Sequence, residues 1–181
     1  GGVQTALSDN TWGGLGFSVE ESNTNIDGTT HTDGTWWQIG GVAKWTEGAM
    51  KLSASVSGGQ GGIDTLRSIS IPGLAAVASS DSDIDFASGL LRFAYSFNAG
   101  TLYVTPMLNA GINHIRLSAF TESGAGGLNL AALSASETIF SGGPALELGT
   151  TIKAEGLTFR PYARFGVTFL SDDSFTTEAR F

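Results

Sequence analysis

The chain has 181 residues, of which 41% are hydrophobic and 14% are charged, with 26 glycines and a formal net charge of −8. It is too apolar for a disordered chain and unusually rich in glycine for a helical one. The lack of cysteine excludes disulfides and thiolate metal sites. The acidic balance argues against nucleic-acid binding, which needs a basic patch. No run approaches the roughly 18 apolar residues of a membrane-spanning helix.

Hydrophobic side chains recur at every second position, which is the period of a β-strand. The pattern is clearest over residues 50–57, where Met50, Leu52, Ala54 and Val56 alternate with Lys and Ser, and it is longest over residues 157–169. It predicts eight strands, in chain order: Gly2–Ser8, Gly13–Ser22, Thr35–Trp45, Ala49–Ser57, Ala87–Phe97, Thr101–Asn113, Pro144–Lys153 and Leu157–Phe169.

The lengths of the strands and of their connections suggest a membrane protein. Most of the predicted strands exceed the five or six residues of an average globular strand and reach the roughly nine to eleven of a tilted membrane-spanning one. Short turns are predicted at residues 9–12, 46–48, 98–100 and 154–156. Long loops are predicted at 23–34, 58–86, 114–143 and from 170 onward. This strict alternation is the rule for outer-membrane barrels, whose short turns are periplasmic.

Within the long connections, Gly58–Gly62 is interpreted as a flexible tip, and Leu74–Ala78 as a helical turn or a strand extension. The fold class predicted for residues 1–181 is all-β: an antiparallel transmembrane β-barrel of the outer-membrane type, with about eight strands here.

Charged and polar side chains fall on the face of each strand opposite the apolar one. A charge facing lipid would cost about 2–4 kcal/mol at the middle of the membrane, so we expect these residues to line a water-filled lumen. The alternative is that they are ordinary solvated residues of a soluble sheet. The predicted lumen residues are Lys44, Lys51, Arg92, Glu147, Lys153, Arg160, Tyr162 and Arg164.

Aromatic residues cluster near the ends of the predicted strands, where amphipathic rings would lie at the headgroup level. In a soluble sheet the same rings would fill a core. The predicted membrane-interface aromatics are Trp12, Trp36, Trp37, Trp45, Tyr95, Phe97, Tyr103, Phe159 and Phe169.

Patterns of catalysis and of metal binding are weak. His31 and His114 are isolated on different loops and make a poor metal site. Asp81, Asp83 and Asp85 alternate as calcium ligands can, but the glycine and the distal glutamate of an EF-hand loop are missing. Gly58–Gly62 lacks the Gly-Lys-Ser/Thr of a phosphate-binding loop, and no nucleophile elbow or catalytic triad is present. The sequence therefore predicts neither an enzyme nor a cofactor.

Two segments resemble the autotransporter β-domain of type V secretion. They are Phe120-Thr121-Glu122-Ser123-Gly124-Ala125 and, as Leu157-Thr158-Phe159-Arg160-Pro161-Tyr162 with a following Gly166, the "L-x-P-Y-x-x-x-G" pattern. Gly149 stands where the family has a strand glycine, and Thr101–Leu108 is similar to the family's preceding strand with its proline. The likeness is good over the second half of the chain and general over the first.

The resemblance implies a twelve-stranded barrel in the outer membrane of a Gram-negative bacterium that carries an N-terminal passenger domain to the cell surface. Strand counting then expects one strand before Gly2 and three after Phe181. The implied partners are the passenger of the same polypeptide, outer-membrane lipid, the barrel-assembly machinery and periplasmic chaperones, without nucleic acid. Two alternatives remain open: a porin-like diffusion channel without a passenger, and a soluble all-β binding module.

Overall fold

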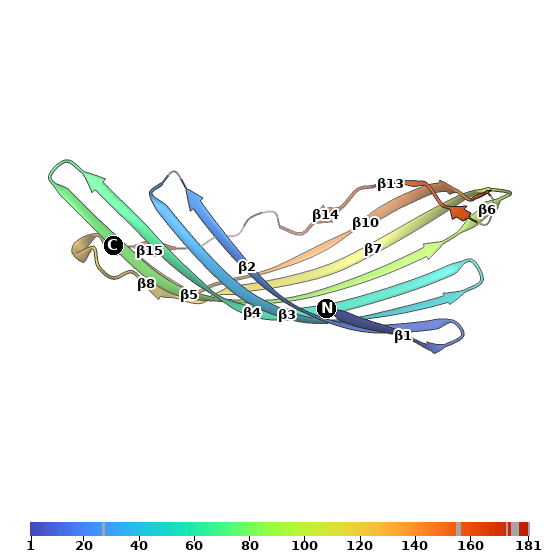
Figure 1. The fold of residues 1–181 in the computed structure, drawn as a ribbon, viewed down its shortest axis with the longest axis horizontal. Coiled ribbons are helices and arrows are strands. Elements are labelled where there is room, and N and C mark those ends of the chain that lie inside the picture. Colours follow the sequence, from blue (N-terminus) through green and yellow to red (C-terminus); the bar gives the residue numbers. More distant parts are fainter. Residues whose placement is uncertain (27, 155–156, 173, 175–177, 181) are drawn as a thin grey trace.

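The computed structural model describes residues 1–26, 28–154, 157–172, 174 and 178–180. Its main sheet is antiparallel, with the strand order β1-β2-β3-β4-β5-β7-β10-β13 (Figure 1). The bounds are β1 Gly2–Ser8, β2 Thr11–Ile26, β3 Thr30–Glu47, β4 Met50–Ile71, β5 Leu74–Tyr95, β7 Leu102–Leu117, β10 Ala135–Thr150 and β13 Tyr162–Gly166. Short strands β6 (Phe97–Ala99) and β14 (Phe169–Leu170) pair with β7 and β10. The predicted all-β antiparallel class is confirmed.

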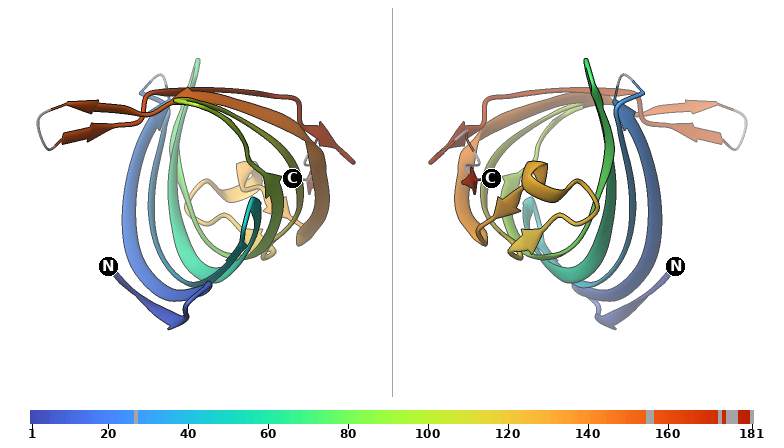
Figure 2. Two further views of the ribbon diagram at one scale, coloured as in Figure 1. Left: turned by 90° about the vertical axis from the view of Figure 1, so that its right-hand side faces the viewer. Right: turned by 90° about the vertical axis from the view of Figure 1, so that its left-hand side faces the viewer.

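The sheet bends into a trough with a hollow side and a convex side, as the end-on views of Figure 2 show. Each strand follows its neighbour in the chain, so the sheet is a meander of hairpins. The right-handed twist of paired strands accumulates across such a sheet and curves it. Among the described residues, β1 and β13 are the two edges and do not pair with each other.

Two of the predicted long loops are instead strand. The pairing of β4 with β5 is unbroken from Met50↔Tyr95 to Ile71↔Leu74, closed by a tight turn with Gly73 at φ +86°. Residues 58–86 are therefore a hairpin, and the predicted flexible tip at Gly58–Gly62 lies inside β4. Likewise, β2 and β3 pair up to Ile26↔Thr30. The sequence criterion missed this because apolar and polar side chains do not alternate regularly along these extensions, whereas ladder hydrogen bonds do not need an apolar face.

The third predicted loop is only partly a loop. β7 runs to Leu117 and β10 begins at Ala135, and between them lie β8 (Phe120–Thr121), the 3-10 helix η1 (Gly126–Leu128) and β9 (Ala131–Ala132). β9 pairs with β8 and also with β15 (Ala179–Arg180). Ser118 donates its amide to the Asp83 carbonyl, and Ser79 and Ser123 form a bridge, so this segment continues the sheet beside β5. No helix in the described part of the chain is long and apolar enough to cross a membrane.

The C-terminal part differs from the two long strands predicted there. β10 ends at Thr150, and β11 (Ile152–Ala154) pairs with β12 (Leu157–Phe159) as a separate hairpin beside the main sheet (Figure 2). Pro161 separates β12 from β13; it has no amide hydrogen to donate to a ladder. The turn predicted at 154–156 and the loop predicted from 170 onward fall partly outside the described residues.

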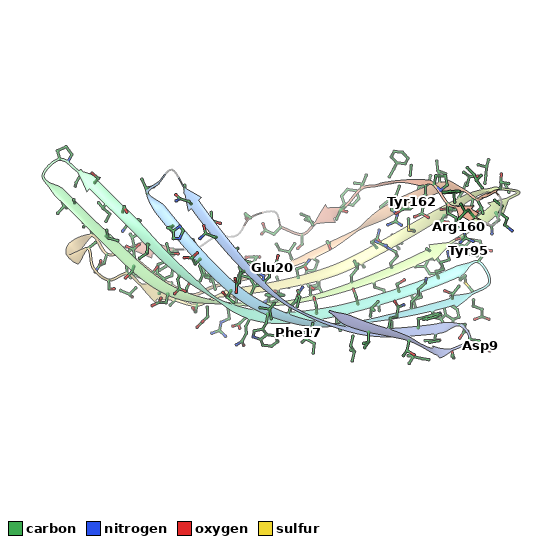
Figure 3. All side chains as sticks on the ribbon, in the orientation of Figure 1. Asp9, Phe17, Glu20, Tyr95, Arg160 and Tyr162 are labelled. Atoms are coloured by element: carbon green, nitrogen blue, oxygen red, sulfur yellow. The ribbon has the colours of Figure 1, made fainter. Side chains whose placement is uncertain are left out.

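The register assigns the side chains to the two faces. Trp45, Leu52, Phe93 and Leu108 stand in one cross-strand row, and Lys44, Ser53, Arg92 and Asn109 stand in the next. The apolar rows form the convex face: Val56 is 67% exposed and Leu108 59%. In Figure 3 Phe17 lies on this side and Glu20 on the hollow side.

The described residues contain only a small core. The buried apolar residues are Ala78, Ala94, Met107 and Ala132. An apolar face of this extent is far larger than the exposed patches that soluble monomers carry. The fold therefore fits an apolar surrounding on its convex side.

Candidate functional site

The hollow face is a polar surface whose side chains bond across neighbouring strands. Ser57 and Ser88 share a hydrogen bond of 2.7 Å between their hydroxyls, and Ser96 and Thr105 share one of 3.0 Å. Arg92 donates from Nε to Oδ1 of Asn109 at 2.6 Å. These contacts link β4, β5 and β7 side to side, and they leave a wettable surface that can exchange hydrogen bonds with a polar chain.

Six of the eight predicted lumen residues lie on this face, by register. Lys44 is in the Arg92 row, and Lys51 pairs with Ala94 beside the buried Met107. Glu147 and Arg164 face each other on β10 and β13, with Arg164 Nε donating to Oε2 at 3.1 Å. Tyr162 lies on the same face of β13, with the Arg164 guanidinium 5.8 Å from its ring centre.

The other two predicted lumen residues lie elsewhere. Lys153 is in β11 and pairs with Thr158 in the separate hairpin, away from the main sheet. Arg160 follows β12 and is exposed between the two strand segments, near Tyr162 (Figure 3). Their assignment assumed two long unbroken strands, and the breaks at Thr151 and Pro161 remove that basis.

The predicted interface aromatics divide between the two faces. Trp37, Trp45, Tyr95, Phe97 and Phe169 are on the convex face, and the rings of Tyr95 and Phe97 are 4.7 Å apart. Trp12, Trp36 and Tyr103 are in hollow-face rows instead, because their neighbours in sequence occupy the convex positions. Phe159 is exposed on β12, outside the main sheet. Position near a strand end does not decide which face a ring takes; the period of two does.

Two hollow-face aromatic residues lie against glycines, and the Trp36 ring covers Gly34 of its own strand, where an added Cβ would lie 2.8 Å from Cζ3. Trp36 donates from Nε1 to Glu20 Oε2 at 3.1 Å and pairs with Gly61, where an added Cβ would lie 2.5 Å from the Trp36 Cβ. Tyr103 similarly covers Gly149, the glycine that the resemblance had singled out. The cross-strand contacts with Gly61 and Gly149 depend on register, which the alternation pattern of a single strand does not encode.

An ion pair between β4 and the segment after β8 was not anticipated. Arg67 donates to both carboxylate oxygens of Glu122, at 2.9 Å from Nε and 2.5 Å from Nη2. The Glu122 side chain is only 4% exposed, and it also accepts the Leu130 amide at 2.8 Å. The guanidinium and that amide hold the pKa of Glu122 below its ordinary value, against the effect of burial. The only sequence signal was the place of Glu122 in the family-like segment.

Acid is expected to loosen this contact. Because the folded pKa of Glu122 is lowered, its contribution to stability is complete above the ordinary carboxyl pKa and is lost as pH falls through the folded value. Hydrogen exchange at the Leu130 amide, corrected for its intrinsic pH dependence, should therefore lose protection in acid. The Ser96 amide, which donates to the Ala49 carbonyl where β5 ends and β4 begins, is the control and should change less. Equal loss at both amides would contradict the role of the carboxylate.

Metal-binding side chains do not gather in the part of the chain that the structure describes: no group of three or more His, Cys, Asp or Glu is placed to hold an ion. His31 contacts Asp33 on β3 at 3.2 Å, and His114 contacts the Thr138 hydroxyl at 2.8 Å. Asp81, Asp83 and Asp85 alternate along β5 and are exposed. What the hollow face offers is hydrogen bonding and paired charge.

The fold is shared with solved translocator domains. The translocator domain of the autotransporter NalP from Neisseria meningitidis aligns with a TM-score of 0.73 and 15% identity, covering 96% of this chain and 60% of that one. The β-domain of the Bordetella autotransporter BrkA aligns with a TM-score of 0.64 and 20% identity, covering 94% and 69%. A comparison with curated proteins gave no match.

The chain thus spans about 60% of the NalP translocator domain. The family profile described as "Autotransporter beta-domain" matches residues 1–181. The sequence resemblance, which was strongest in the second half, is therefore confirmed over the whole length. The chain belongs to the autotransporter β-domain family.

Proposed function

We propose that this chain forms wall strands of an outer-membrane β-barrel that anchors and exports a passenger domain of the same polypeptide in a Gram-negative bacterium. The observation that carries the proposal is the two-faced trough. Its convex side is apolar and its hollow side is polar, along strands long enough to cross a bilayer.

The mechanism follows from the different chemistry of the two faces of the sheet. Ladder hydrogen bonds satisfy the backbone polar groups of the wall, which lipid cannot do. Convex side chains such as Val56 and Phe93 face acyl chains, while Arg92 and Asn109 face water. An extended passenger segment passes along the hollow face, where cross-strand polar groups replace part of its hydration. Transport of this kind requires neither a cofactor nor a catalytic residue.

The proposed partners follow from the same picture. Lipid contacts the convex face, with Trp37, Trp45, Tyr95, Phe97 and Phe169 as its interface aromatics. Lys44, Lys51, Arg92, Glu147, Tyr162 and Arg164 face the lumen. Family membership supports a tethered passenger, and we extend this to the barrel-assembly machinery and periplasmic chaperones that insert such a barrel.

Surface exposure of the passenger tests the proposal. The full-length protein, with an epitope in the region N-terminal to this domain, is expressed in a Gram-negative host, and intact cells are treated with protease. We expect the epitope to be cleaved in intact cells, while a periplasmic marker protein stays protected. An epitope that stays in the periplasm, together with small-solute uptake in a liposome-swelling assay, would favour the porin-like channel instead.

A further inference from the structure

Residues 122–130, here called the cap, cover the hollow side of the β4–β5 hairpin beyond the apolar belt. Arg67 and Ala78 are register partners on that side, and Ala78 is fully buried. Ser80, the next hollow-face residue of β5, is 8% exposed. Figure 2 shows the segment with β8 and η1 at the end of the trough, within its open mouth. The cap therefore lies where a channel along the hollow face reaches the outside.

The cap is held to the wall by polar contacts at two places: Ser79 of β5, which exchanges two backbone hydrogen bonds of 2.9 Å with Ser123, and the Arg67 side chain of β4. Besides the two bonds to Glu122, the Arg67 guanidinium donates from Nη2 to the Leu128 carbonyl at 3.0 Å. Within the cap, Glu122 accepts the Leu130 amide and Asn129 Oδ1 accepts the Ala125 amide at 2.8 Å. One guanidinium thus joins the wall to the first residue and to the far turn of the cap.

Apolar packing contributes little to this attachment. η1 has no buried residue, so the hydrophobic term that fixes most helical turns is small here. Gly124 at φ +99° and Gly126 at φ +61° take backbone conformations that other residues resist, and they stand on either side of Ala125. A segment held by a few polar contacts, with two such glycines inside it, can be released without unfolding the wall.

We propose that the cap is a reversible gate at the cell-surface mouth of the barrel, clamped shut by the Arg67–Glu122 ion pair and opened when that pair breaks. The gate rests on the proposed transport function, since it presupposes a pore along the hollow face. The pair suits this role because breaking a buried ion pair by removing one partner is strongly destabilising to what it holds.

Single-channel conductance of the full-length protein in planar lipid bilayers tests the gate. Glu122→Gln removes the charge and keeps the shape, and we expect full openings to become at least tenfold more frequent. Asp83→Asn is the matched control, since it removes the same charge from the convex side of the same hairpin and should leave the opening frequency unchanged. Heat-modifiability on gels shows that both variants are folded.

A locked variant gives the opposite test. The Ser79 and Ser123 hydroxyl oxygens are 3.2 Å apart across a bridged pair, a position suited to a disulfide, and the chain has no other cysteine. In the double variant Ser79→Cys, Ser123→Cys we expect oxidation to suppress full openings and reduction to restore them.

Equal opening frequencies in Glu122→Gln and wild type, or openings unaffected by the disulfide, would overturn the gate. A wild type that conducts nothing would instead count against the pore, and exchange protection at the Leu130 amide would then decide the clamp: protection unchanged in Glu122→Gln would refute it.

Discussion

Replacing Val56 by lysine is expected to lower the stability of the membrane-inserted domain by about 2–4 kcal/mol, because a charge at the middle of the lipid face must leave water. Val56 lies on the convex face, is 67% exposed, and stands in register with Gly41 and Gly89. Urea unfolding in lipid vesicles, followed by tryptophan fluorescence, measures the loss. In cells, the variant should also reach the surface in smaller amounts.

The neighbouring residue supplies the control. Ser55 lies one position earlier on the half-buried hollow face, opposite Val42 and Leu90. Lysine at Ser55 would extend into the polar lumen, so we expect a loss of less than about 1 kcal/mol, as for a surface change. If Val56→Lys and Ser55→Lys destabilised the domain equally, the convex side would not face lipid. That result would contradict the hypothesis that these strands cross the membrane.

Replacing Gly59 by alanine is expected to destabilise the wall by about 1–3 kcal/mol, the range for overpacked sites. An added Cβ at Gly59 would lie 2.7 Å from Cζ of Phe86 and 2.9 Å from the Gln38 Cα, and it would also collide with the Trp37 carbonyl oxygen. Two of these neighbours are backbone atoms, so relief requires β3 to move. The temperature at which the folded band disappears on a gel should fall accordingly.

Gly62→Ala is the control, in the same strand but on the convex face. Nothing lies within 4 Å of a Cβ built there. Since alanine also loses less backbone entropy than glycine, we expect this variant to be neutral or slightly more stable. A destabilisation as large as that of Gly59→Ala would show that flexibility of β4, and not close approach, is what glycine provides.

The period of two predicted the first seven long strands of the main sheet, because lipid on one side and water on the other force an apolar and a polar face; the eighth predicted strand is instead divided into β12, β13 and β14. This held for residues 50–57, whose alternation matches the observed faces. The signal fades where water lies on both sides, as in residues 60–71, although the strand continues. A hydropathy pattern reports the surroundings of a strand, whereas the ladder that forms the strand depends on backbone bonds.

The features of the hollow face that depend on a single strand were also predictable from the sequence, whereas those that join distant strands were not. Faces of Arg92, Glu147 and Arg164 followed from parity along single strands. The Glu122–Arg67 pair joins residues 55 positions apart through two intervening pieces of chain, so no local pattern encodes it. Trp12 and Tyr103, predicted as interface aromatics from their closeness to strand ends, lie in hollow-face rows by parity, which was not part of that prediction.

Because β4 is longer than the membrane is thick, the β4–β5 hairpin extends above the lipid surface. Some 12 residues of β4 lie beyond the apolar belt, which at about 3.3 Å per residue and a tilt near 45° corresponds to roughly 28 Å. Paired backbones resist bending, so this hairpin is a rigid extension of the barrel wall and not a flexible loop. A polypeptide leaving the mouth would stay beside it for that distance. The exported polypeptide could therefore begin to fold only well outside the headgroup layer, where antibodies and proteases can reach it.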